Sequence, residues 1–331
     1  MDNFDELDRK GFLGLYRQMS GYIRVETELR NDEEERNFIT MFGTSPDMCS
    51  YLWLLLQTQS FLLSTKARPV HLLWGLVMLK TYGSEALLLH SVRIDGMKAT
   101  NRKTYRQWTW HIIHAIADLT AYVVSTYMHM CLQFTLLSPF FYFLISHRRS
   151  FCLCLSPPKI CDKWDGRFDG VPEGEKAVCI DGIDCQRTEP APFFQGNYSF
   201  KFNGPALRYE LGTSRDGNII HLSGPFIPGI NRDDLLFKNN TFAQLKPGEI
   251  CEGDAMYRKF LRDTFPGDNT EEDKKLSNRW RARHETANAR IKRFKVISCK
   301  FRHDIVKHSD AFRACAVITQ LEIENGKPLF D

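Results

Sequence analysis

The chain has 331 residues, of which 43% are hydrophobic and 25% are charged, and its net charge is +4. These values are ordinary for a globular protein of one large or two smaller domains and do not favour a disordered chain. The charge is unevenly distributed: residues 1–47 carry eleven acids against six bases, whereas residues 279–303 carry nine bases and one acid, Glu285. This basic block indicates either a phosphate-facing surface or a solvated helix face, and charge alone favours the second.

Ten cysteines are scattered along the chain without a CxxC pair or the Cys and His spacing of a zinc finger. The N-terminal sequence MDNFDELDRK is acidic and lacks the apolar segment of a secretory signal. We therefore expect reduced cysteines, most of them in the core of an intracellular protein.

The first part of the chain predicts an acidic N-terminal arm over residues 1–41, followed by a helical region over residues 42–123. Ser45 is a typical N-cap before a proline, and Ser84 is a typical N-cap for a short helix. Between them, a helix is expected to begin at Pro69 and to end just before Gly83.

Residues 101–120 predict a longer amphipathic helix whose first turns carry Arg102, Lys103 and Arg106. Short helices with tight connections are typical of a helix-turn-helix unit, in which Lys103 and Arg106 would bind DNA phosphates. A plain helical bundle with a basic edge fits the same pattern equally well.

Residues 124–159 differ from their surroundings. The stretch 129–146 is apolar over the length of a marginal transmembrane helix, and a single membrane span is the direct interpretation. We favour a retained intron translated in frame. The segment is poor in acids and interrupted by Pro139 and Pro157, its start can be encoded by a splice donor, and LSPPK can be encoded by a pyrimidine tract followed by AG.

The remaining residues, 160–331, predict a mixed α/β domain. Short apolar runs separated by Gly and Asn turn signals indicate strands, and RDGN at 215–218 indicates a hairpin turn. A polar loop is expected at 266–275, before the basic helix that contains Glu285. Strands are expected within 177–185, 197–204, 206–226 and 248–257, and helices within 231–246, 279–295 and 307–326.

Two of these strands end at an acid, Asp181 and Asp254, and a carboxylate beside a buried strand is costly without a partner. Sites in open α/β sheets are built at strand ends. Two strand-borne aspartates and the helix-borne Glu285 are what a two-metal phosphoryl-transfer site requires, and oxygen ligands favour Mg²⁺ or Mn²⁺. Asp181 in a DG pair also fits a simple turn, and Asp254 also fits a surface acid.

The chain resembles the PIF/Harbinger-type DDE transposases over residues 42–120 and 160–331. CIDGIDC, GEICEGDAMY and RARHETANARIKRFKVI resemble the three catalytic blocks of that family in order and spacing, and HLLWGLVMLKTYGSE resembles its N-terminal helix-turn-helix region. Met256 is a departure, because members commonly have Gly before the tyrosine. A bulky residue there is expected to disturb the turn after Asp254.

The resemblance implies an RNase H-like catalytic domain with a mixed sheet, preceded by an all-α helix-turn-helix region. It implies Asp181, Asp254 and Glu285 as ligands of two Mg²⁺ or Mn²⁺ ions, cleavage and transfer of DNA strands, and a location in the nucleus. Asp184 competes with Asp181 as the first acid, and we prefer Asp181 because Gly follows it directly.

DNA is the expected partner, with a Myb-like protein and self-association as further expectations, and a membrane is not expected as one. Arg281, Arg283 and Lys292 would hold DNA phosphates around Glu285, which otherwise is an ion-pair partner for Arg281. Two other functions stay open: a DNA-binding protein without catalysis, and a membrane protein anchored by residues 129–146.

Overall fold

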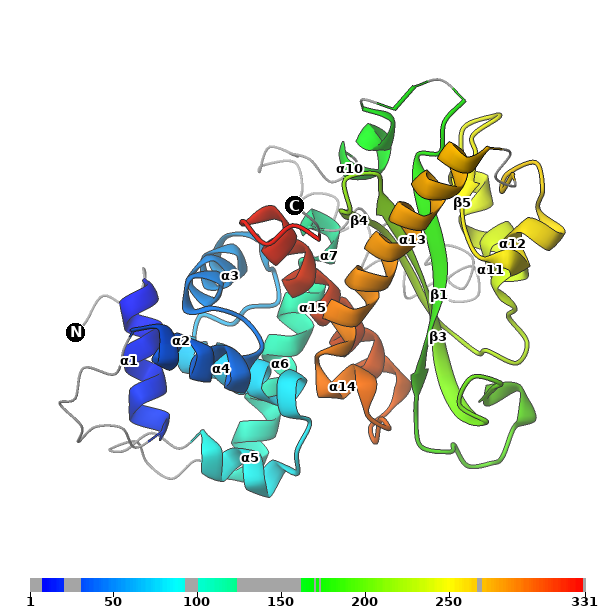
Figure 1. Cartoon of the computed structure of the whole chain (residues 1–331). Coiled ribbons are helices and arrows are strands. Elements are labelled where there is room, and N and C mark those ends of the chain that lie inside the picture. The colour runs from blue at the N-terminus through cyan, green and yellow to red at the C-terminus, as the bar shows by residue number, and fades with distance from the viewer. Residues whose placement is uncertain are drawn as a thin grey trace, which may run out of the picture.

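The computed structural model describes residues 8–20, 31–92, 101–123, 162–169, 171–172, 174–266 and 270–329. The described chain is a mixed α/β protein, as the sequence predicts, with a helical half joined to a half that contains the sheet (Figure 1). The helices of the first half are α1 (Arg9–Ser20), α2 (Asn31–Phe42), α3 (Pro46–Gln59), α4 (Pro69–Thr81), α5 (Glu85–Ser91), α6 (Arg102–Asp118) and α7 (Thr120–Val123).

The helices of this half begin at capping residues that the sequence indicates. The side chain of Ser45 accepts from the N–H of Met48, and that of Ser84 accepts from the N–H of Leu87. α4 begins at Pro69 as expected, but its left-handed end residue is Tyr82 with φ 48° and not Gly83. The aromatic ring of Tyr82 stacks on Phe301, so tertiary packing holds a conformation that usually selects glycine.

Residues 1–41, expected to be an arm, contain two helices that pack into the protein. Phe12 of α1 and Phe38 of α2 are fully buried, and the two helices are joined by an ion pair of 2.6 Å between Arg17 Nε and Glu34 Oε1. Three of the acids that suggested a solvated arm, Asp32, Glu33 and Glu34, lie in the first turn of α2, where they face the positive end of the helix dipole.

A mixed sheet forms the centre of the second half. β1 (Val178–Gln186) pairs antiparallel with β3 (Gly204–Ser214) on one side and parallel with β5 (Cys251–Glu252) on the other. β3 also pairs antiparallel with β4 (Ile219–Phe226) and, at its start, with β2 (Tyr198–Ser199). The predicted hairpin joins β3 to β4, with Gly217 at φ 83°.

The helices of this half are α10 (Asp162–Asp165), α11 (Asp233–Asn240), α12 (Ala255–Phe260), α13 (Glu271–Lys292), α14 (Lys295–Ser298) and α15 (Ile305–Glu324). α13 begins at Glu271, so the predicted loop at 266–275 is wrong in its second part. Thr270 forms a capping box with Asp273, and the three acids of the first turn favour the helix start there.

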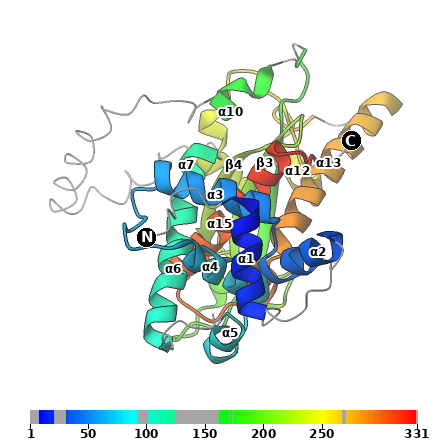
Figure 2. The same cartoon turned by 90° about the vertical axis from the view of Figure 1, so that its left-hand side faces the viewer.

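The two faces of the sheet are covered differently. On one face Ile183 and Tyr209 belong to the same core as α4, α6, α13 and α15, and α15 lies between the sheet and the helical half (Figure 1). Figure 2, viewed from the helical side, shows the first-half helices in front of α15 and the sheet. On the other face Ile180 packs with Phe237 and Tyr257 in a second, smaller core. One continuous core therefore joins residues 42–123 to the C-terminal part of the chain.

The proposed intron at 124–159 and the apolar stretch 129–146 lie outside the described residues. Within the described ranges, no helix is both long enough and apolar enough to cross a membrane.

Candidate active site

The parallel pairing of β1 and β5 brings Asp181 and Asp254 to the same edge of the sheet. Cys179 pairs with Glu252 in register, and each aspartate follows its member of this pair by two residues. Side chains two residues apart on a strand share a face, and neighbouring strands lie about 4.8 Å apart. The backbone of Asp254 is still extended, at φ −74° and ψ −179°, which places its carboxylate at the same edge of the sheet as Asp181, where its charge acts on Asp181.

Each of these aspartates uses one carboxylate oxygen to bind backbone. Asp181 Oδ1 accepts from the N–H of Gly182 at 2.8 Å. Asp254 Oδ1 caps α12, accepting from the N–H groups of Met256 at 2.8 Å and Tyr257 at 3.3 Å. Neither Oδ2 has a hydrogen-bond partner among the described residues. The backbone bonds fix the orientation of both carboxylates and leave one oxygen of each for a ligand.

The environment of Asp181 opposes its negative charge. Burial raises the pKa of Asp181 to about 6, the N–H of Gly182 counteracts this rise, and the charge of Asp254 adds to it. The positive charges of Lys201 and Lys292 act in the opposite direction. A bound divalent cation would stabilise such an arrangement, in which a half-buried carboxylate, Asp181, lies near an exposed one, Asp254.

Asp184, the competing first acid, is already held in an ion pair. Its two oxygens form a bidentate ion pair with Arg208, at 2.7 Å from Nε and 2.9 Å from Nη2, and one of them also accepts from the Ser199 hydroxyl. Side chains alternate along β1, so Asp184 lies on the face opposite to Asp181. The geometry therefore favours Asp181 over Asp184 as the carboxylate that is available to bind a ligand.

Glu252 is a buried acid of this region that sequence reasoning missed. Its Oε2 lies 2.5 Å from Lys176 Nζ, and its Oε1 lies 2.6 Å from Arg258 Nη2 and 3.6 Å from Arg281 Nε. The sequence signal was an acid inside a two-residue buried strand, which requires ion-pair partners. Because Arg281 belongs to α13, this cluster fixes that helix against the strand that leads to Asp254.

The structure places Glu285 exposed on α13, one turn after Arg281. Among the described residues it has no hydrogen-bond or ion-pair partner, so the expected pairing with Arg281 does not occur. α13 lies along the sheet (Figure 1). Before Glu285 in α13, Arg281 contacts Glu252. After it, the charge of Lys292 acts on Asp181. Glu285 therefore lies on the stripe of α13 that runs past the aspartate pair.

The two other basic residues expected around Glu285 differ in their surroundings. Arg283 donates to the backbone oxygen of Arg215 in the turn between β3 and β4, which turns it away from the aspartates. Lys292 is half-buried; burial lowers its pKa, and the charges of Asp184 and Asp181 oppose this. It has no hydrogen-bond partner among the described residues, which leaves the ammonium group free to bind an anion.

In the helical half, Lys103 and Arg106 lie in the first two turns of α6, both exposed. Arg106 forms a bidentate ion pair with Glu85, with both N···O distances at 2.6 Å. Lys103 has no hydrogen-bond or ion-pair partner among the described residues. Both residues belong to α6 in the helical half, whereas the aspartate pair belongs to the half that contains the sheet (Figure 1).

Asp233 is another acid of this region that was not singled out from the sequence. It is the first residue of α11, and burial raises its pKa to about 6, which Arg208 counteracts and Asp181 reinforces. A Cβ added at Gly182 would lie 2.2 Å from Asp233 Oδ1. The available signal was an acid at a helix start, which is too common to be informative.

Met256 does not disturb the turn after Asp254. It is the second residue of α12, its N–H bonds to Asp254 Oδ1, and its side chain is 37% exposed. The backbone has no positive φ at this position, so the glycine that the family commonly carries is not required for this turn.

Comparisons of the chain with protein-family models, curated proteins and solved structures find no match. The donor set of Asp181 and Asp254 fits a hard cation, because each offers a carboxylate oxygen without a protein partner. In the part of the chain that the structure describes, no three His, Cys, Asp or Glu side chains are grouped closely enough to hold a metal ion. Of the three expected ligands, Asp181 lies on β1, Asp254 follows the neighbouring strand β5, and Glu285 lies on α13.

Proposed function

We propose that this protein is a metal-dependent DNA endonuclease or transposase of the PIF/Harbinger DDE type, acting in the nucleus. The observation that carries the proposal is the Asp181 and Asp254 pair. The two acids lie 73 residues apart in the chain, yet the register of β1 and β5 makes them neighbours, each with a free carboxylate oxygen. Cleavage of a phosphodiester by a metal-ion mechanism requires such a pair.

Asp181 and Asp254 would hold Mg²⁺ or Mn²⁺, with Glu285 as the proposed third ligand. When bound, the two ions would activate the attacking oxygen and stabilise the leaving oxygen of the phosphodiester. The protein contributes orientation through the backbone hydrogen bonds to both aspartates. Lys292 contributes an unpaired positive charge near Asp181, where the phosphate of the substrate would lie.

The strand arrangement supports an RNase H-like domain. Three antiparallel strands in the order β4, β3, β1 are followed by β5, which is parallel to β1. The exposed bases at the start of α6 support a DNA-binding role for the helical half, with a helix-turn-helix as its proposed form. A Myb-like partner, by family resemblance, remains part of the proposal, and so does self-association.

A DNA-binding protein without catalysis is the second candidate. It is favoured by one observation, that Glu285 is exposed and lies outside the aspartate pair. Both functions require the exposed bases at the start of α6 to bind DNA. They differ only in whether the bound DNA is cut.

Nicking of supercoiled plasmid by the full chain, in Mg²⁺ or Mn²⁺, separates the two candidates. Asp254→Asn keeps the cap on α12, because the amide oxygen still accepts from Met256, but it removes the carboxylate charge. We expect this variant to lose nicking and to keep DNA binding. Asp263→Asn, at an exposed acid of the same region, is the control and should cut normally.

If wild type binds DNA and never nicks it with either metal, the non-catalytic candidate is correct. If Asp254→Asn cuts as fast as wild type, the site assignment is wrong.

A further inference from the structure

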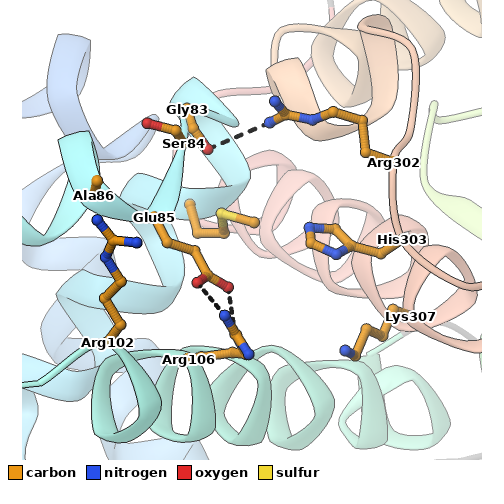
Figure 3. Close-up of a pocket in the computed structure, with 10 residues that line it drawn as sticks. Gly83, Ser84, Glu85, Ala86, Arg102, Arg106, Arg302, His303 and Lys307 are labelled. Atoms are coloured by element: carbon orange, nitrogen blue, oxygen red, sulfur yellow. Dashed lines mark hydrogen bonds and ion pairs between the residues drawn. The ribbon is translucent and has the colours of Figure 1, made fainter.

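A pocket of about 500 Å³ lies where the helical half meets the C-terminal part of the chain (Figure 3). Its lining comes from segments that are roughly 200 residues apart in the chain. One side is formed by the end of α4, by α5 and by the start of α6. The other side is formed by the loop before α15 and by the first turn of α15. The residues that line it are Met78, Gly83, Ser84, Glu85, Ala86, Arg102, Arg106, Arg302, His303 and Lys307.

The pocket gathers four cationic side chains, and Figure 3 shows them on both of its sides. Among the lining residues, Glu85 is the only acid, and both of its oxygens are bound by Arg106. Outside the lining, Asp304 caps α15 and lies 3.8 Å from Lys307 Nζ. The positive charges therefore exceed the negative charges, and the excess is held in a concave surface.

The excess positive charge acts on the titratable groups of the pocket. Burial lowers the pKa of His303, and the charges of Lys307 and Arg302 lower it further. The pKa of Glu85 is also lowered, mainly by its hydrogen bonds to Arg106, with added effects from His303 and Arg102. Burial and the hydrogen bonds to Arg106 are the main causes of these two pKa shifts, and the smaller contributions from neighbouring cations have the sign of a local positive potential, which favours an anion.

Two of the helices that begin at the pocket increase this potential. α6 and α15 are long helices, and neither has an acid in its first turn. Basic residues stand there instead, Arg102 and Lys307, next to the positive end of the helix dipole. The first turns of α2 and α13, in contrast, each carry three acids. At α15 the carboxylate of the N-cap, Asp304, already faces the positive end of the dipole. At α6 the N-cap is the neutral Asn101, so a negatively charged ligand in the pocket would offset the unfavourable charge there.

The cations differ in how firmly the protein holds them. Arg302 donates to the backbone oxygens of Tyr82 at 2.8 Å and Gly83 at 3.3 Å, and its guanidinium lies over the Tyr82 ring. Lys307 lies over the ring of Trp110. Arg102 has no hydrogen-bond or ion-pair partner among the described residues. Arg302 and Lys307 are thus held in position by the protein, and Arg102 is free to move toward a ligand. This arrangement suits a phosphate that is bound from two sides.

We propose that this pocket binds phosphates of the DNA backbone, so that the helical half and the C-terminal part of the chain hold one DNA molecule together. The proposal rests on DNA being the substrate of the proposed function. Phosphate is the favoured anion because guanidinium groups bind it through paired N–H donors. DNA is the favoured source because Arg102, Arg106 and Arg302 are exposed at the pocket surface, where an extended strand can pass.

The test measures binding of the full chain to a short duplex of arbitrary sequence, without divalent metal, over a range of salt concentrations. Arg102→Gln removes the free cation of the pocket and breaks no contact that the structure describes. We expect weaker binding and a slope of log Kd against log salt that is smaller by about 0.9, the effect of one lost phosphate contact. Adding Lys307→Gln should reduce the slope again.

The matched control is Arg36→Gln, which removes the same charge from an exposed position of α2. It should leave the slope unchanged. Equal slopes for wild type and Arg102→Gln, or equal losses in Arg102→Gln and Arg36→Gln, would overturn the proposal, because the pocket would then have no special contact with DNA. Absence of all DNA binding by wild type would instead overturn the proposed function.

A second measurement distinguishes DNA from a small phosphorylated molecule. Pyrophosphate is titrated into wild type and Arg102→Gln by calorimetry. Tight pyrophosphate binding that Arg102→Gln abolishes, with an unchanged salt slope for DNA, would show that the pocket serves a small anion and would overturn the DNA proposal. Weak pyrophosphate binding with the reduced DNA slope supports it.

Discussion

Asp233 Oδ1 occupies the space next to the α-carbon of Gly182, so that a Cβ at position 182 would lie 2.2 Å from this oxygen. The contact joins the start of α11 to the middle of β1. It gives a physical reason for the glycine that follows Asp181: any side chain there would displace a carboxylate. The Asp-Gly pair is therefore part of a packed strand and not a turn.

Gly182→Ala should lower the free energy of unfolding by about 1–3 kcal/mol, because it overpacks this contact. Urea unfolding measures the change. Gly14→Ala is the control: Gly14 lies within α1 with no atom near its missing Cβ, so alanine should add about 0.5–1 kcal/mol of stability. Adding Asp233→Ala to Gly182→Ala should restore part of the loss. If the changes in unfolding free energy of the two single variants simply add in the double variant, the two positions are not in contact.

Asp181→Asn should stabilise the metal-free protein above pH 6. The pKa of Asp181 is raised to about 6 from its ordinary 3.8, so the unfolded chain loses this proton first as the pH rises. The carboxyl therefore opposes folding increasingly between pH 4 and 6, and fully above that range. The gain in unfolding free energy should be about 1–3 kcal/mol at pH 7 and close to zero at pH 4. A gain of equal size at both pH values would contradict the assignment.

Divalent metal should stabilise the folded protein through the aspartate pair. A ligand that binds only the folded state raises Tm, and a chelator should reverse the rise. We expect Mg²⁺ or Mn²⁺ to raise the Tm of wild type and to have no effect on Asp254→Asn. Glu285→Gln tests the third ligand: a smaller metal-dependent rise in Tm would support it. An unchanged rise would show that Glu285 does not bind the ion.

Breaking the ion pair of Arg167 and Glu249 should be costly. The two side chains are each 1% exposed and are joined at 2.7 Å, with the guanidinium 4.1 Å from the centre of the Trp164 ring. Arg167→Met should lower the free energy of unfolding by about 3–5 kcal/mol, because it leaves the buried Glu249 carboxylate without its ion-pair partner and with only the N–H of Lys246 bound to it. Lys274→Met breaks an exposed pair with Glu271 and should cost at most about 0.5 kcal/mol. Similar losses in the two variants would contradict the burial of the first pair.

Stability should also fall in mild acid because of buried histidines. Burial and the charge of Arg187 lower the pKa of His308 to about 3, while its Nδ1 binds the Tyr209 hydroxyl. Below pH 6.5 the unfolded chain takes up a proton that the folded chain does not, so folding is opposed. The contribution of His308 should be about 2 kcal/mol between pH 6.5 and 5. His308→Gln should reduce the pH dependence by this amount, whereas His90→Gln, at an exposed position, should not.

Much of the local structure follows from the sequence because it depends on neighbours in the chain. Ser45 and Ser84 cap their helices as expected, and Gly217 forms the hairpin turn between β3 and β4. Prediction failed where two local signals competed. The acids after Thr270 were taken for a loop because they are polar, yet at a helix start the same acids stabilise the helix.

The candidate site was predicted in its residue types and not in its geometry. Asp181 and Asp254 stand out because an acid beside an apolar strand is costly. Only the parallel register of β1 and β5 makes them neighbours, however, and no local pattern encodes the pairing of strands so far apart. The ion pair that occupies Asp184 likewise depends on Arg208, which lies on another strand and which no local pattern connects to Asp184.

The sequence by itself determined the mixed α/β class, the capped helices of the first half and the acids that could do chemistry, because periodicity and capping act over a few residues. Tertiary structure decided which charges meet. It left Glu285 without an ion-pair partner among the described residues, placed Glu252 among three cations, and brought Arg302 and Lys307 beside α6. Charge interactions depend on distance in space, and folding sets that distance through packing of a core that spans both halves of the chain.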